Sequence, residues 1–398
     1  MNMDILKNRV FKYEYLFKLY SMFRSRKQET EYRIKREHYN IKNTCDKNIF
    51  WTGKRRRTSE NVHTFAIFPL VSWHESLLPD LESLGSVTHF DYEPTIGKGP
   101  NFFSWRERIN RDLVDMFTRV HSQRPVDWVF AYVQGTHILA ETMNLIRKRF
   151  GVPTVNMCFD DKQSWEVRRL GGQWCGSVEL VPAFDLWWTS SRVTVDWVNS
   201  EGGHGIYLPE GCDAGSFSDE ELPYSIPVSF VGAAYGARSP MVRYLRKHGV
   251  YVKTFGHGWG PDSMISHEEM RDVFRRSQIN LGHGGIGYSE AITNVKGRDF
   301  DVPCAGGGVY LTTFNPDLAK HFHIGEEILC WHSYDDLLEQ VRWHLNRPEL
   351  CRQMARRARA RCLQEHRWLH RYTTVLELLG VVATSSAEQK MNSTTPSK

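Results

Sequence analysis

The 398-residue sequence has no long hydrophobic run and no paired cysteine motif. Because no stretch of about 18 consecutive apolar residues occurs, a membrane-spanning helix is not expected. The opening MNMDILKNRV lacks the apolar segment of a secretory signal. The eight cysteines are scattered and none forms a CxxC pair, which argues against a zinc ribbon or a disulfide framework. These absences predict a protein of the reducing cytoplasm.

The composition is that of a folded protein with more than one domain. Hydrophobic residues make up 41% of the chain and charged residues 24%, and there are 13 Trp, 21 Phe and 16 Tyr. So many aromatic side chains exclude disorder as a global state. At roughly 150 residues per domain, the length predicts two domains with additional segments.

The net charge of +5 hides a strong asymmetry along the chain. Residues 1–57 carry a net charge of +10, so the rest carries −5. Apolar residues in this arm recur at spacings of three and four, which predicts a basic helical arm over 1–60. Such an arm packs on the body or on a second copy of the chain, or it binds an anionic membrane surface at the inner membrane face. We expect no contact with nucleic acid.

Beyond the arm, short apolar strands alternate with helical segments, which predicts parallel, doubly wound sheets. A stretch rich in Pro, Gly and acidic residues at 208–227 interrupts the alternation and is typical of a linker. The expected organisation is an N-terminal Rossmann-like acceptor domain over 61–215 and a C-terminal Rossmann-like domain over 216–365. A closing helix over 366–380 and a disordered tail over 381–398 follow. The predicted fold class is α/β, with two Rossmann-like domains facing a cleft.

Three glycine-rich loops of the second half follow predicted strands, where phosphate groups bind in such sheets. The first contains Gly232 and, at the start of a helix, Arg238, and the second contains Gly256 and His257. The third, residues 282–287, includes Gly284 and has the form GxGxxG. An NAD fingerprint is one interpretation of this motif, but it follows a late strand of the fold. A tight turn that shapes a sugar or phosphate pocket is the other interpretation.

The segment 295–314 combines two cations, two acids and a glycine run. If residues 297–305 form a short helix, its N-terminus, Lys296 and Arg298 face one anionic site. Asp301, one turn further on, then accepts hydrogen bonds from the hydroxyls of a ribose, and Gly306 and Gly307 turn the chain into a strand. A surface helix with local ion pairs is the alternative interpretation.

Three residues of the N-terminal half are candidates for the base that deprotonates an acceptor. Asp160 and Asp161 follow a strand and are expected at its carboxyl end, and His137 has the same placement after another strand. Helix capping by the two acids and a structural role for His137 are the alternatives. Glu210, in the linker, is a further candidate for contact with a donor sugar.

Residues 295–370 resemble the C-terminal part of CgeB-like spore-maturation glycosyltransferases, a branch of the group 1 glycosyltransferases. The resemblance extends over about 63–380, and the arm lies outside it. The matching positions are Lys296, Arg298, Phe300, Asp301, Pro303, Gly306-Gly307, Leu311-Thr312, Gly325-Glu326-Glu327-Ile328 and His366-Arg367-Trp368. Two positions depart from the family pattern: Asp301 stands where the family has Glu, and Arg367 where it has Thr.

The resemblance implies a GT-B enzyme that binds a nucleotide-sugar donor, with UDP-sugars favoured, mainly through its C-terminal domain. GT-B enzymes need no bound metal, so none is expected. The implied activity is transfer of a sugar to a hydroxyl of a glycan, a lipid-linked acceptor or a protein, as in polysaccharide biosynthesis. The alternative is a non-catalytic GT-B-like protein that binds carbohydrate or acts as a scaffold.

Overall fold

The computed structural model describes residues 61–165, 169–170, 173–218, 220–286 and 289–382, and the single positions Phe23 and Thr30. The described chain divides into two compact units. The N-terminal unit comprises residues 61–208 together with the segment that begins at Trp368, and the C-terminal unit comprises Pro209–Arg367. The chain therefore leaves the N-terminal unit before the boundary expected at 215, and its last helix returns to that unit. The predicted arm and tail lie outside the described residues, apart from those two positions, Val381 and Val382.

The N-terminal unit is built on a parallel sheet in the order β2-β1-β3-β4-β7-β8. Its strands are β1 (Val62–Ile67), β2 (Gly85–Phe90), β3 (Trp128–Ala131), β4 (Thr154–Met157), β7 (Leu186–Thr189) and β8 (Gly205–Tyr207). Its helices are α3 (Leu78–Glu82), α4 (Phe102–Gln123), α5 (Ala140–Phe150), α6 (Asp161–Ser164), α7 (Arg192–Ser200) and α13 (Trp368–Leu378). A small antiparallel hairpin, β5 (Arg169–Leu170) with β6 (Gln173–Trp174), was not predicted.

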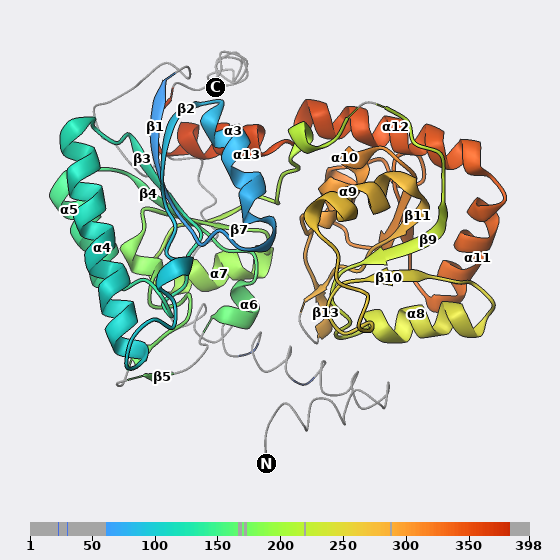
Figure 1. Ribbon diagram of the computed structural model, residues 1–398, viewed down its shortest axis with the longest axis horizontal. Coiled ribbons are helices and arrows are strands. Elements are labelled where there is room, and N and C mark those ends of the chain that lie inside the picture. The colour runs from blue at the N-terminus through green and yellow to red at the C-terminus, as the bar shows by residue number, and fades with distance from the viewer. Residues whose placement is uncertain are drawn as a thin grey trace, which may run out of the picture. The chain divides into compact units, whose positions relative to one another are not determined.

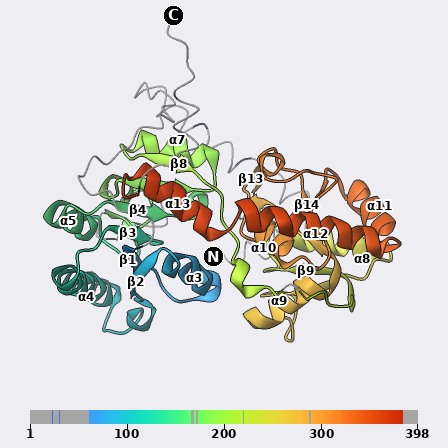
Figure 2. The ribbon, with the colours of Figure 1, turned by 90° about the horizontal axis from the view of Figure 1, so that it is seen from above.

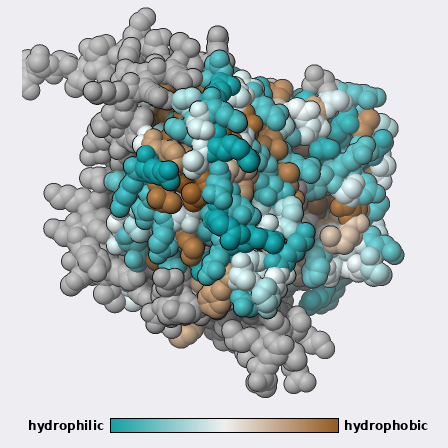
Figure 3. All heavy atoms as spheres, turned by 60° about the vertical axis from the view of Figure 1, so that its left-hand side comes forward, coloured by the Kyte–Doolittle hydropathy of each residue, from teal (hydrophilic) through white to brown (hydrophobic). Residues whose placement is uncertain are grey.

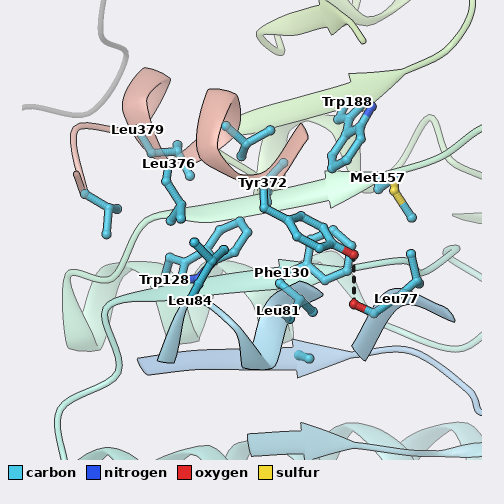
Figure 4. Close-up of a cluster of buried hydrophobic side chains, with 14 of the residues drawn as sticks. Leu77, Leu81, Leu84, Trp128, Phe130, Met157, Trp188, Tyr372, Leu376 and Leu379 are labelled. Carbon is cyan, nitrogen blue, oxygen red and sulfur yellow. Dashed lines mark hydrogen bonds between the residues drawn. The ribbon is translucent and has the colours of Figure 1, made fainter. Parts of the chain in front are cut away.

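Helices cover both faces of this sheet, with α4 and α5 on one face and α3 and α13 on the other (Figures 1 and 2). The second face holds an aromatic core, in which Trp128, Phe130 and Trp188 pack against α13 (Figure 4). Tyr372 of α13 donates a hydrogen bond of 3.0 Å to the carbonyl of Leu77. This buried bond ties the returning helix to the start of the unit.

The C-terminal unit contains a second parallel sheet, in the order β10-β9-β11-β14-β15. Its strands are β9 (Ile226–Val231), β10 (Lys253–Phe255), β11 (Ser277–Leu281), β14 (Val309–Thr313) and β15 (Leu329–Trp331). Its helices are α8 (Arg238–Lys247), α9 (His267–Arg276), α10 (Arg298–Ala305), α11 (Tyr334–Leu345) and α12 (Pro348–Glu365). A hairpin of β12 (Gly285–Ile286) and β13 (Ser289–Thr293) interrupts the alternation.

The helices of this unit also lie on two faces. Helices α8 and α11 pack on one side of the sheet, and α9 and α10 on the other. Local sequence explains several boundaries: α9 begins with a capping box in which Ser266 and Glu269 exchange hydrogen bonds, and α10 ends at Gly306 with φ +66°. The predicted short helix over 297–305 is thereby confirmed.

The order of the strands indicates where each sheet binds ligands. In both sheets, the first strand lies between the second and the third, so the connections reverse direction there. Ligands of doubly wound sheets bind outside the carboxyl ends of the strands at such a switch point. In the C-terminal unit this point lies where β9 and β11 end.

No helix in the described ranges combines the length and apolar character needed to cross a membrane. On the face shown in Figure 3, hydrophilic residues predominate among the coloured atoms, and hydrophobic ones form small separate spots. Isolated apolar residues of this kind are normal on protein surfaces.

Candidate functional site

The switch point of the C-terminal unit is built around Gly232, the first residue after β9. Its φ is +141°, and a Cβ there would lie 2.5 Å from Nη2 of Arg298 and 3.4 Å from Nη1 of Arg238. Gly256, after β10, has φ +113°, and a Cβ on it would lie 2.8 Å from the carbonyl carbon of Gly232. Glycine at both positions therefore lets two loops and two guanidinium groups approach closely.

The two guanidinium groups are held against aromatic rings. The Cζ of Arg298 lies 5.4 Å from the ring centre of Phe230, and that of Arg238 lies 4.1 Å from the ring centre of Tyr235. Arg238 also donates to the carbonyl of Ala233 at 3.2 Å. We call Gly232, Arg238, Lys296 and Arg298 the cationic crease.

A buried hydrogen-bonded pair fixes the turn that carries Lys296 and Arg298. Asp299 accepts from the hydroxyl of Tyr310 at 2.6 Å and from the backbone N–H of Lys296 at 2.7 Å. Burial raises the pKa of Asp299, and these bonds and the nearby cations counteract the rise. The side chains of Lys296 and Arg298 form no hydrogen bond or ion pair with any other described residue. Both charges therefore remain available to an anion.

Carboxyl groups also lie close to this turn. Oε2 of Glu210 lies 2.5 Å from the position that a Cβ on Gly297 would occupy, and Oδ2 of Asp301 lies 3.7 Å from it. Burial and the neighbouring charge of Asp213 raise the pKa of Asp301 to about 7. Within the described ranges, no group of three or more His, Cys, Asp or Glu residues is arranged to hold a metal ion.

The other predicted donor-site residues are placed in two regions. His257 is exposed, and its carbonyl accepts from Ala234 at 2.8 Å, beside the crease. Gly284 is buried and donates to Oγ1 of Thr313 at 2.8 Å. Gly306 and Gly307 lie at the far end of α10, where a Cβ on Gly306 would lie 2.6 Å from Cδ of Arg359. Close packing explains why glycine is needed at these two positions, and the structure does not bring them to the crease.

The GxGxxG motif does not open a helix. After β11, Gly285 and Ile286 form strand β12, which pairs with β13 in an antiparallel hairpin. A dinucleotide fingerprint needs a helix after its glycines, so that the N-terminus of that helix holds the pyrophosphate. The interpretation of 282–287 as an NAD site is therefore wrong.

Sequence reasoning missed His283, which lies in the same loop. Its ring is buried, and its Nδ1 faces the backbone N–H of Gly285 at 3.1 Å. Burial, together with the charges of Arg238, Lys296 and Arg298, lowers the pKa of His283 to about 3. The sequence signal was a histidine between glycines after a strand, which alone does not separate ligand from packing roles.

In the N-terminal unit, the three candidate bases differ in accessibility. Asp160 is exposed at the N-cap of α6, whereas Asp161 is buried and accepts from Nε1 of Trp187 at 3.3 Å. Burial raises the pKa of Asp161 to about 7. His137 is half-buried, with its ring centre 5.3 Å from that of Tyr92.

Comparison with known proteins agrees with this architecture. The family model described as "Glycosyl transferase-like" matches residues 238–377, which include the cationic crease from Arg238 onwards. No curated protein matches the chain.

Three solved structures are similar over most of the chain. Sucrose-phosphate synthase from Thermosynechococcus elongatus has 12% identity and a TM-score of 0.52, over 84% of this chain and 100% of its own. A glycosyltransferase from Rickettsia africae has 8% identity and a TM-score of 0.53, over 80% and 99%. Anabaena Alr3699/HepE, solved with UDP and glucose, has 10% identity and a TM-score of 0.53, over 80% and 99%. At such identities, these likenesses show the fold alone.

These findings define the fold of the protein. The two parallel α/β sheets and the similar structures confirm the predicted GT-B fold. The chain carries a glycosyl transferase-like domain in its C-terminal half.

Proposed function

We propose that the protein transfers a sugar from a nucleotide-diphosphate sugar to an acceptor hydroxyl, without a bound metal. The observation that carries this proposal is the cationic crease at the switch point, where Lys296 and Arg298 lack partners among the described residues. Like charges held close together repel one another, and an anion bound between them relieves that repulsion. The matching family and the nucleotide bound to Anabaena Alr3699/HepE support a nucleotide sugar as that anion.

The cationic crease supplies the positive charge that the departing diphosphate requires. As the bond between sugar and diphosphate breaks, negative charge develops on the leaving phosphate oxygen. Arg238, Lys296, Arg298 and the N-terminal end of α10 stabilise that charge. Asp301 and Glu210 accept hydrogen bonds from hydroxyls of the nucleotide ribose or the sugar.

The acceptor hydroxyl loses its proton to a base of the N-terminal unit. Asp160 and His137 keep accessible surface, whereas Asp161 is enclosed and does not reach an acceptor in this conformation. We therefore assign the base to Asp160 or His137, with Asp161 positioning the turn beneath.

The finer assignments follow from the sequence. The resemblance to CgeB-like enzymes supports a glycan, lipid-linked or protein acceptor, and UDP is the first donor nucleotide to test. The basic arm supports a cytoplasmic enzyme that is peripheral to an anionic membrane or self-associates.

Isothermal titration of the full chain against UDP, GDP, dTDP and CMP tests the donor site. Binding of one nucleoside diphosphate is expected, and the lack of any would refute the proposal. Release of free sugar, or its transfer to acceptors, then separates an enzyme from a non-catalytic GT-B-like binding protein. A chain that binds the nucleotide sugar but never cleaves it belongs to the second class.

A further inference from the structure

His283 lies beside the cationic crease in the sheet register. In the parallel pair of β9 and β11, Leu281 is opposite Phe230. Continuing that register by two residues places His283 alongside Gly232, the glycine that the guanidinium groups of Arg238 and Arg298 approach. The residue is only 7% exposed. A buried imidazole is thus held next to converging cations.

One nitrogen of the ring is fixed by the backbone. Nδ1 lies 3.1 Å from the backbone N of Gly285, and because that N–H can only donate, Nδ1 must accept. The proton of a neutral ring then lies on Nε2. No described residue forms a hydrogen bond with Nε2.

The surroundings keep this ring neutral. The charged groups that act on it are Arg238, Lys296 and Arg298, and all three oppose a further positive charge. At the same place, a cationic imidazole would also lose its bond to Gly285, since both of its nitrogens would donate. With its pKa lowered to about 3, His283 is neutral near pH 7.

The loop that carries His283 is rigidly seated. A Cβ on Gly282 would overlap the hydroxyl of Tyr310, the group that donates to Asp299. On the other side of the histidine, Gly284 donates to Oγ1 of Thr313 at 2.8 Å. The loop therefore packs directly on the pair that positions Lys296 and Arg298.

We propose that His283 is a further ligand of the donor, whose Nε2–H donates a hydrogen bond to a phosphate oxygen held in the cationic crease. This inference rests on the proposed function for the identity of the anion. A neutral donor differs from the three cations because it adds direction without adding charge. The site therefore binds an anion more tightly when one of its phosphate oxygens lies at the position that Nε2–H can reach.

Substitution at this position tests the role. His283→Ala removes the donor, whereas His283→Gln places an amide N–H near the position of Nε2. Titrated with UDP-glucose and, separately, with inorganic pyrophosphate, the alanine variant should bind about tenfold to a hundredfold more weakly than the wild type. The glutamine variant should recover part of that loss. His248→Ala, at the end of α8, is the matched control and should leave both affinities unchanged.

The protonation state of the His283 ring can also be measured directly in the wild type, so that this test does not depend on the folding of a variant. In the wild type labelled with ¹⁵N-histidine, the His283 signals should report a neutral ring protonated at Nε2 at pH 6. The Nε2–H signal should shift when UDP-glucose or pyrophosphate is added. A cationic ring, a proton on Nδ1, or an alanine variant that is folded and binds both probes normally would overturn the proposal.

The two probes separate this proposal from the proposed function. If the wild type binds pyrophosphate but no nucleotide sugar, the glycosyltransferase assignment fails. The role of His283 is then still tested by comparing the affinities of the wild type and the His283 variants for pyrophosphate. If it binds UDP-glucose with His283→Ala unaffected, only the role of His283 fails. If it binds neither probe, the role of His283 is overturned, and the glycosyltransferase assignment is then decided by the titrations with GDP, dTDP and CMP.

Discussion

The guanidinium of Arg298 lies where a side chain on Gly232 would have to be, with Nη2 only 2.5 Å from the position of a Cβ. The two residues are 66 positions apart and belong to different βα connections. Their contact explains why the loop after β9 needs glycine and why the cation of α10 reaches the switch point. Because Gly232 has no side chain, there is room for the charged group of Arg298.

Substituting Gly232→Ala should therefore weaken donor binding as well as stability. The φ of +141° would strain an alanine by about 1–3 kcal/mol, and the added methyl would displace Arg298. Calorimetric titration should show an affinity for the nucleoside diphosphate about tenfold lower or worse. Gly249→Ala is the control, because its φ is +83° and no atom lies within 4 Å of its Cβ position. It should lower the melting temperature but leave affinity intact; equal losses of affinity in both variants would refute the explanation.

Removing the charge itself should affect binding more than folding. Arg298→Ala deletes the planar donor that we propose as a phosphate ligand, and such an interaction is typically worth about 1.5–3 kcal/mol. Affinity for the nucleoside diphosphate should drop roughly tenfold to a hundredfold. Arg243→Ala removes an exposed arginine from α8 and should change neither affinity nor stability. A folded Arg298→Ala protein with unchanged affinity would remove Arg298 from the site.

The buried pair beneath the crease should govern stability. Tyr310→Phe deletes the 2.6 Å hydrogen bond to Asp299, and both residues are 2% exposed. The buried carboxyl loses a donor, so the free energy of unfolding in urea should fall by about 1–3 kcal/mol. Donor affinity should also fall, because Asp299 orients Lys296. Tyr251→Phe, at a position 72% exposed, is the control and should have no effect on either quantity. A Tyr310→Phe protein as stable as the wild type would show that the bond contributes nothing.

The basic arm should matter for location or assembly and not for the donor site. Deleting residues 1–57 removes a net charge of +10. The truncated chain should bind the nucleoside diphosphate normally but lose co-sedimentation with anionic liposomes at low salt, since each cation contributes about 1 kcal/mol near such a surface. If the full chain ignores these liposomes, the membrane role is wrong. A changed mass in light scattering after deletion would then favour an oligomerisation arm.

Much of the fold was predictable because its signals are local. Helices α9 and α12 have local start signals, because a capping box opens α9 and Pro348 is the first residue of α12. The hairpin β12–β13 was missed because glycine-rich segments carry no alternation of apolar residues. The return of α13 to the N-terminal unit depends on contacts such as Tyr372 with Leu77, which no local pattern reveals.

The candidate site was predictable in its charges but not in its geometry. The spacing of Lys296 and Arg298 before a short helix indicated an anion site, and the structure brings Arg298 together with Arg238 and Gly232. Gly306 and Gly307 are close to Lys296 and Arg298 in the sequence, but they lie at the opposite end of α10. Distance along the sequence alone could not show that they are not part of the cationic crease. Predicting a role for His283 would have required the register of β9 and β11, which places this residue beside Gly232.

The enclosed carboxyl of Asp161 should make the protein less stable as the pH rises. Its pKa is about 7 in the folded protein against an ordinary value of 3.8, mainly because burial disfavours the charged form. Between about pH 4 and pH 7 the folded state therefore holds a proton that the unfolded state has lost, so the free energy of unfolding decreases with increasing pH. Asp301 has the same displaced pKa and adds to the same slope.

Replacing Asp161→Asn isolates the contribution of this residue, because asparagine resembles the protonated acid and cannot ionise. Urea unfolding should give similar stabilities for variant and wild type at pH 4, with the variant more stable at pH 8. The difference should be at most about 4 kcal/mol, the free energy that corresponds to a pKa difference of this size. Asp160→Asn, at the exposed neighbouring position, should keep the wild-type slope. If Asp161→Asn is instead destabilised at pH 8 and retains the full wild-type slope, Asp161 is an ordinary ionised carboxylate and its burial does not govern the pH response.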